Sequence, residues 1–205
     1  MNAKEEILAR IATALEDRPT IEATPREYHH AGTTTAEDVV GRFEERVLDY
    51  KADVRRCAPS ELVDTIAQAL ADRSASRIVV PDGVPNDWHV DGVVDQPQLS
   101  PVELDELDGV LTTCAVGIAE TGTIVLDHGP GQGRRALSLV PDYHVCVIRT
   151  DQIVHSVPDA VAALDPIRPL TWISGGSATS DIELNRVEGV HGPRHLCVII
   201  VTQPD

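Results

Sequence analysis

Apolar residues near the amino terminus recur with the 3.6-residue period of an α-helix. Ile7, Leu8, Ile11 and Leu15 predict a short amphipathic helix over residues 4–17. The stretch that follows contains two prolines, a glycine and a run of threonines, which break this period. We therefore expect residues 1–35 to form a helix and linker arm, and residues 36–205 to form the main domain.

Two further helical patterns enclose the first predicted strand, at residues 53–58. Thr35 is a candidate N-cap for the first of these helices, because its hydroxyl can accept a backbone hydrogen bond. The second helix is predicted over residues 59–73. The apolar positions are Val39, Val40, Phe43 and Val47 in the first helix, and Leu62, Val63, Ile66 and Leu70 in the second.

The rest of the chain is dominated by strand patterns. "SRIVVP", "GVLTTCAVGIA", "GTIVLD", "YHVCVIRT" and "HLCVIIV" each predict a strand. The apolar run "CVIIV" is continuous rather than alternating, which is typical of a strand covered on both faces. Helices alternate with strands early in the chain, so we predict an α/β fold with a mixed sheet.

The net charge of −16 argues against nucleic acid as a partner, because such binding needs a basic surface. Eight acidic residues and no Lys or Arg lie between Asp82 and Asp108. This block is interpreted as a solvated face, with a docking face for a basic partner as the alternative. No apolar run is long enough to span a membrane, and the first residues do not resemble a signal peptide. We expect a cytoplasmic protein.

Cysteine and lysine usage excludes several classes of site. Cys57, Cys114, Cys146 and Cys197 are single and far apart, so no zinc or iron–sulfur motif is present and no cofactor is expected in this chain. No metal site is expected in this chain. There are two lysines in the whole chain, which argues against Schiff-base and P-loop chemistry.

The first candidate site lies in residues 117–148. A sharp turn at Glu120, Thr121 and Gly122 joins two strand patterns, and a carboxylate there is placed to act as a nucleophile or base, with an ordinary turn residue as the alternative. The loop "HGPGQGRR" follows, where glycines expose backbone N–H groups and Arg134 and Arg135 add positive charge. An anion cradle and an ordinary glycine-rich loop both remain open.

The second candidate site is "ISGGSATSDIELNRVEGVHGPRHL". Ser180 and Glu183 form a capping box with Asp181 in the first turn, which predicts a short helix that ends at Gly189. A run of glycines and hydroxyls precedes this helix start, an arrangement that favours a phosphate or carboxylate. His191 is the best histidine candidate, with a hydrogen bond within its own turn as the alternative. The candidate residues before the helix are Ser174, Gly175, Gly176, Ser177 and Thr179.

Taken together, "GIAETGTIVL…GRRALSLVPDYHVCVI" and "SGGSATSDIELNRVEGVHGPRHLCVIIV" resemble the LUD (lactate utilization) domain family, and in particular its C-type members. The resemblance is strongest over residues 109–202. The chain departs from the family at Gly176, where a proline is usual between Gly175 and Ser177.

The resemblance implies a Rossmann-like fold related to CoA transferases and sugar-phosphate isomerases. It also implies a cluster-free subunit or accessory protein that works with iron–sulfur proteins in oxidising L-lactate to pyruvate, with the clusters in those partners. Two alternatives stay open. In the first, the chain is an independent enzyme that uses Glu120. In the second, it is a regulatory anion sensor. The sequence does not decide the oligomeric state, and a homo-oligomer is possible.

Overall fold

The computed structural model describes residues 2–17, 23–25, 36–176, 178–179, 187–189 and 191–202. The first helix, α1 (Ala3–Ala14), begins with a capping box between Asn2 and Glu5. Every residue of α1 is exposed, including the apolar face predicted from the sequence. The predicted N-cap of the second helix, Thr35, lies outside the described residues.

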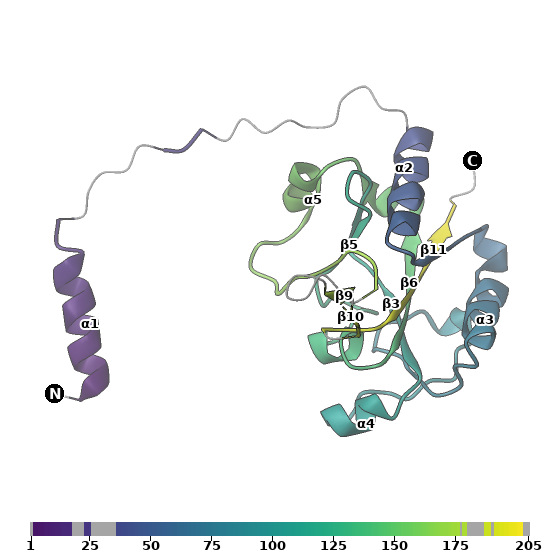
Figure 1. The fold of residues 1–205 in the computed structure, drawn as a ribbon, viewed down its shortest axis with the longest axis horizontal. Helices are drawn as coiled ribbons and strands as arrows, with labels where there is room; N and C mark the ends of the chain where they lie inside the picture. The colour runs from purple at the N-terminus through teal and green to yellow at the C-terminus, as the bar shows by residue number, and fades with distance from the viewer. Residues whose placement is uncertain are drawn as a thin grey trace.

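Five parallel strands form the central sheet, in the order β1-β11-β6-β3-β2 (Figure 1). Helix α2 (Ala36–Asp49) precedes the sheet, and helix α3 (Leu62–Asp72) with a leading 3-10 turn, η1 (Pro59–Glu61), joins β1 to β2. The strands are β1 (Asp53–Cys57), β2 (Ile78–Val79), β3 (Gly109–Thr113), β6 (Tyr143–Arg149) and β11 (His195–Val201).

A second, mixed sheet has the order β7-β4-β5-β8, with β4 parallel to β7 and antiparallel to β5. The prediction of one strand over residues 109–119 is therefore wrong. The apolar run divides at Cys114 and Ala115, and its halves pair in different sheets. The strands of this sheet are β4 (Val116–Ile118), β5 (Thr123–Leu126), β7 (Ile153–Val154) and β8 (Thr171–Ile173).

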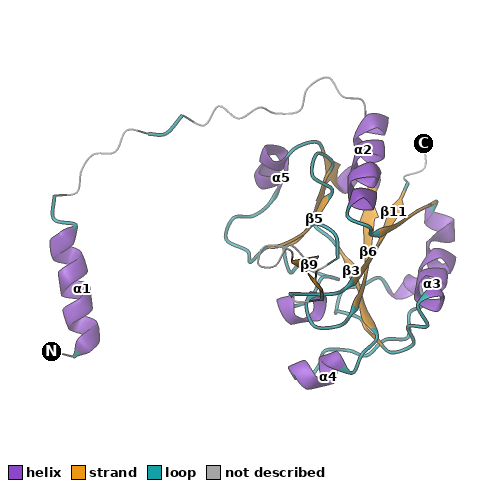
Figure 2. Cartoon of the chain, viewed as in Figure 1, coloured by secondary structure: helices purple, strands orange, loops and turns teal. Residues whose placement is uncertain are grey.

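Short helical segments connect the strands (Figure 2), and the sequence patterns predicted none of them. α5 begins at a capping box between Ser156 and Asp159. Within the described residues, no helix is both long and apolar enough to span a bilayer. The segments are α4 (Pro101–Asp105), α5 (Val157–Ala163), η2 (Asn86–Trp88), η3 (Arg135–Ser138) and η4 (Thr150–Gln152).

The two faces of the central sheet are buried against different layers. Alternate side chains of a strand point to opposite faces, so Tyr143, Val145 and Val147 of β6 pack with α3 on one face. Cys146 and Ile148 pack with α2 and β5 on the other face. Figure 1 shows α3 and β5 on opposite sides of the central strands. The α/β class predicted from the sequence is confirmed, with a parallel sheet and a separate mixed sheet.

The segment after β8 departs from the prediction of a capped helix. β9 (Ala178–Thr179) and β10 (Val187–Glu188) pair with each other in an antiparallel manner. The predicted helix is therefore wrong at Val187 and Glu188, because strand pairing takes up their backbone groups. The capping residues Ser180, Asp181 and Glu183 lie outside the described residues.

Candidate functional site

A cavity of about 490 Å³ opens between β8 and the amino ends of β6 and β11. Both the glycine turn after β8 and the η3 segment line this cavity, as do His144 and Leu196 of the central sheet. A second hollow adjoins it and shares four lining residues, namely Arg135, Leu139, His191 and Gly192. We call the 490 Å³ cavity the inter-sheet pocket.

Five of the residues predicted from the sequence line the inter-sheet pocket. They come from three separate stretches of the chain, which the fold brings together: Arg135, Ser174, Gly175, Gly176 and His191. Arg135 is exposed, and no carboxylate in the described part of the chain lies within ion-pair distance of it. Its guanidinium is therefore placed to receive an anion.

A chain of hydroxyls joins the two candidate motifs. Thr121 Oγ1 lies 2.7 Å from Thr123 Oγ1, which lies 2.8 Å from Ser174 Oγ at the pocket. The pairing of β5 with β8, with Ile124 opposite Ile173, sets this arrangement. Residues more than fifty positions apart thus share one hydrogen-bonded network.

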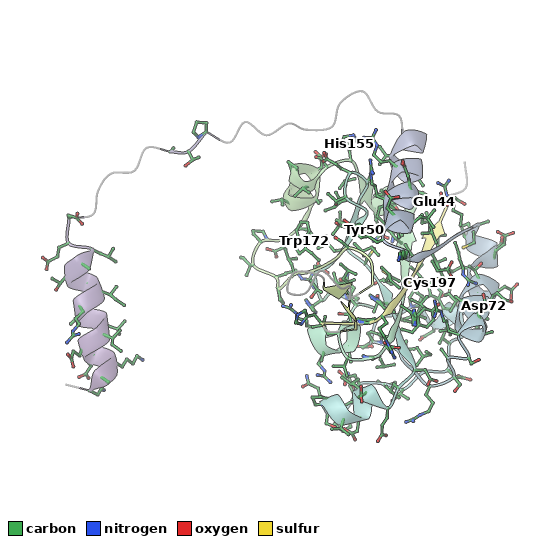
Figure 3. The ribbon with its side chains drawn as sticks, viewed as in Figure 1. Glu44, Tyr50, Asp72, His155, Trp172 and Cys197 are labelled. Atoms are coloured by element: carbon green, nitrogen blue, oxygen red, sulfur yellow. The ribbon has the colours of Figure 1, made fainter. Side chains whose placement is uncertain are left out.

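Glu120 itself is exposed on the turn between β4 and β5, and its backbone N–H donates to the carbonyl of His155 at 3.0 Å. His155 lies beside the beginning of α2 in Figure 3. Gly122 has a φ of +60°, and a Cβ there would stand 2.6 Å from the Arg46 backbone. The close approach of this turn to α2 gives Gly122 a packing role, and Glu120 is not among the residues that line the inter-sheet pocket.

Arg134 has partners elsewhere. Its Nε lies 2.6 Å from Asp95 Oδ2 and its Nη2 lies 3.0 Å from Asp95 Oδ1, and Nη2 also donates to the carbonyl of Leu99. The hydrogen bonds from Arg134 to Asp95 lower the pKa of the Asp95 carboxyl. Arg134 lines a different cavity, together with His128. The structure therefore separates it from Arg135, although the two residues are adjacent in the sequence.

The glycine turn after β8 is held tightly by its neighbours. Gly175 has a φ of +78°, and a Cβ there would overlap the Cβ of Tyr50. A Cβ on Gly176 would stand 2.5 Å from the carbonyl oxygen of Arg194. These contacts fix the position of the turn at the pocket.

The remaining predicted residues are not placed at side-chain level. Ser177, Asp181 and Glu183 lie outside the described residues, and Thr179 is described only through its place in β9. Their assignment to the site stays a prediction.

His144 is a pocket residue that sequence reasoning missed. It is 1% exposed, and its Nε2 lies 2.7 Å from Thr112 Oγ1 on β3, while no hydrogen-bond partner for Nδ1 is found in the described part of the chain. Burial lowers the pKa of the His144 imidazole to about 4, so the ring is neutral at pH 7. The available signal was a histidine in register with the buried positions Cys146 and Ile148 of an apolar strand.

Apolar side chains form much of the rest of the pocket. Trp172 is 42% exposed, although β8 is otherwise half-buried or buried. Leu139, Leu170 and Leu196 are further lining residues. The pocket thus combines one cation, one buried neutral histidine and an apolar wall, which is typical of sites for organic anions.

Within the described ranges, no cluster of three His, Cys, Asp or Glu side chains is placed to hold a metal ion. The four cysteines are all buried free thiols. Burial is the largest cause that raises the pKa of the Cys197 thiol, to about 12, which makes it a poor metal ligand.

Comparison with known proteins agrees with this architecture. The chain is 51% identical to lactate utilization protein C of Deinococcus radiodurans, over 97% of this chain and 95% of that protein. It is 27% identical to lactate utilization protein C of Halalkalibacterium halodurans, over 98% of this chain and 94% of that protein. A crystal structure of a DUF162 family protein from D. radiodurans matches with a TM-score of 0.71 and 47% identity, over 82% of this chain and 99% of that one.

The sequence profile of the LUD domain matches residues 40–201, which confirms the resemblance seen in the paired motifs. The chain belongs to the LUD domain family.

Proposed function

We propose that this protein acts in lactate utilization, as a cluster-free subunit or accessory protein of an iron–sulfur system that oxidises L-lactate to pyruvate. The observation that carries the proposal is 51% identity, over nearly the full length of both chains, to a protein named for lactate utilization. The iron–sulfur clusters belong to partner proteins in this scheme. The burial of all four thiols supports that assignment.

The inter-sheet pocket is the proposed binding site for an organic anion. Arg135 supplies the positive charge, and the turn of Ser174, Gly175 and Gly176 lines the same pocket, as does His191. Glu120 and Arg134 have no part in this site as proposed, because Glu120 is not a lining residue and Arg134 is bound to Asp95.

The first test is purification of the tagged chain, without oxygen, from its own cells grown on lactate. We expect iron–sulfur proteins to accompany it, together with lactate-dependent reduction of a dye. A deletion strain without a paralogue should lose growth on lactate. A chain that purifies alone, from a species in which its deletion leaves growth on lactate unchanged, would contradict the proposal.

The second test asks whether the pocket contributes. Arg135→Ala should impair growth on lactate when it replaces the wild-type gene, because it removes the cation that faces the anion. Arg149→Ala is the matched control, since Arg149 is also an exposed arginine but lies at the opposite end of β6 and pairs with Asp151. Equal growth of the two variants would refute a role for the pocket.

A further inference from the structure

The most unusual side chain of the inter-sheet pocket is His144. A hydrogen bond holds one edge of its imidazole ring, since Thr112 Oγ1 lies 2.7 Å from Nε2. Thr112 is fully buried, and His144 Nε2 is the acceptor that its hydroxyl meets in the described part of the chain. A buried hydroxyl hydrogen requires an acceptor. Thr112 therefore donates to Nε2, and the ring hydrogen of the neutral imidazole lies on Nδ1.

The Nδ1–H group is then a buried donor that lacks a partner among the described residues. Buried donors in folded proteins are nearly always satisfied, so an unsatisfied one calls for an explanation. His144 is one of the residues that line the inter-sheet pocket, and the inference is that a ligand oxygen that enters the pocket becomes the acceptor of this buried N–H group. Neutral histidine suits an uncharged oxygen such as a carbonyl or a hydroxyl.

The other lining residues limit the ligand further. Arg135 provides a cation suited to a carboxylate. Trp172, Leu170 and Leu196 provide an apolar surface that a carboxylate alone would leave uncovered. A cavity of about 490 Å³ lies in the usual range for ligands of drug size, and is too spacious for a three-carbon acid.

We propose that the inter-sheet pocket binds a carboxylate that also carries a carbonyl or hydroxyl oxygen and an apolar body. Arg135 binds the carboxylate, the Nδ1–H of His144 donates to the second oxygen, and Trp172 packs against the apolar body. Thr112 is the positioning residue that fixes the imidazole. This assignment rests on the proposed function, because it uses the same pocket.

The test uses three matched acids and isothermal titration calorimetry on the purified full chain. 2-Oxo-4-phenylbutanoate carries all three features, 4-phenylbutanoate lacks the oxo oxygen, and 2-oxobutanoate lacks the ring. We expect the first acid to bind about tenfold more tightly than 4-phenylbutanoate, as one additional hydrogen bond implies. It should also bind more tightly than 2-oxobutanoate. Equal affinity for 2-oxo-4-phenylbutanoate and 4-phenylbutanoate would overturn the role of His144.

Two variants separate the two ring nitrogens. The His144→Gln amide reaches the Nε2 position and keeps the contact with Thr112, whereas the His144→Asn amide occupies the Nδ1 position and keeps a donor to the ligand. We expect His144→Gln to lose the tenfold preference for the oxo acid and His144→Asn to keep most of it. Cooperative thermal unfolding of each variant confirms that it is folded. A full preference in folded His144→Gln would refute the assignment.

The outcome for the ligand is separable from the outcome for the proposed function. If none of the three acids binds at millimolar concentration while lactate-dependent activity still co-purifies with the chain, the ligand class is wrong and the role in lactate utilization stands. If the oxo acid binds as expected and lactate growth does not depend on the chain, the ligand assignment stands and the lactate role fails.

Discussion

The burial of neutral His144 makes a quantitative prediction about stability in acid. Its pKa falls to about 4 in the folded protein, from 6.5 in the unfolded chain, because the ring is buried. Between these two pH values the unfolded state binds more protons than the folded state, so acid favours unfolding. The contribution of the neutral His144 ring to the free energy of unfolding is complete above pH 6.5 and is lost as the pH falls toward 4. Between pH 7 and pH 4.5 it amounts to about 2 kcal/mol of unfolding free energy.

The substitution His144→Gln removes this titration while it keeps a hydrogen bond to Thr112. Urea unfolding at pH 7 and at pH 4.5 gives the free energy of unfolding at each pH. The loss of stability on acidification should be about 2 kcal/mol smaller in His144→Gln than in the wild type. Carboxylates such as Asp95, whose pKa is lowered chiefly by hydrogen bonds from Arg134, contribute equally to both proteins and cancel in this comparison.

The exposed His89 provides a control. It adopts a left-handed backbone conformation that asparagine tolerates, so His89→Asn tests whether the loss of an exposed histidine is enough to produce the effect. An identical loss of stability in His144→Gln and the wild type would refute the reasoning, because it would mean that the buried ring does not titrate between the two pH values.

Two further predictions concern packing. Arg134→Ala should lower the unfolding free energy by about 2 kcal/mol, because it removes the cation that pairs with the Asp95 carboxylate, whose side chain is 12% exposed. The exposed ion pair of Arg149 should contribute less than about 0.5 kcal/mol when Arg149→Ala is measured by the same urea titration. Gly122→Ala should cost about 2 kcal/mol or more, since its φ is +60° and its Cβ would meet the α2 backbone. Gly41→Ala should instead raise the midpoint of thermal unfolding, because nothing lies within 4 Å of the new Cβ in α2 and alanine favours helix, and equal shifts for both glycines would contradict this account.

Local patterns predicted the larger elements well. The 3.6-residue spacing of Phe43 and Val47 in α2, and of Leu62 and Ile66 in α3, marks the faces that are buried in the structure. The continuous apolar run of β11 predicted a strand that is covered on both sides, as observed. The prediction of these elements was correct because a buried helix face or a buried strand requires apolar residues at the spacing of that element.

Long-range pairing was not visible in the same way. Nothing in "GVLTTCAVGIA" marks the break at Cys114 and Ala115, because both halves are equally apolar, and only their pairing with different sheets separates them. The site shows the same limit. Adjacent Arg134 and Arg135 could not be assigned to separate cavities, because the position of Asp95 is a tertiary property.

The connections between the two sheets give the inter-sheet pocket its character. Cys114 and Ala115 alone link β3 to β4, and η4 alone links β6 to β7, so both short connections lie at the carboxyl ends of the central strands. At the amino ends the chain makes much longer excursions, from Leu126 to Tyr143 and from Ile173 to His195. The spacing of the sheets is therefore fixed covalently at one end, whereas at the pocket it is determined by side-chain packing. A substitution among the leucines of the pocket should accordingly change the width of its opening, while the two sheets keep their spacing at the carboxyl ends of the central strands.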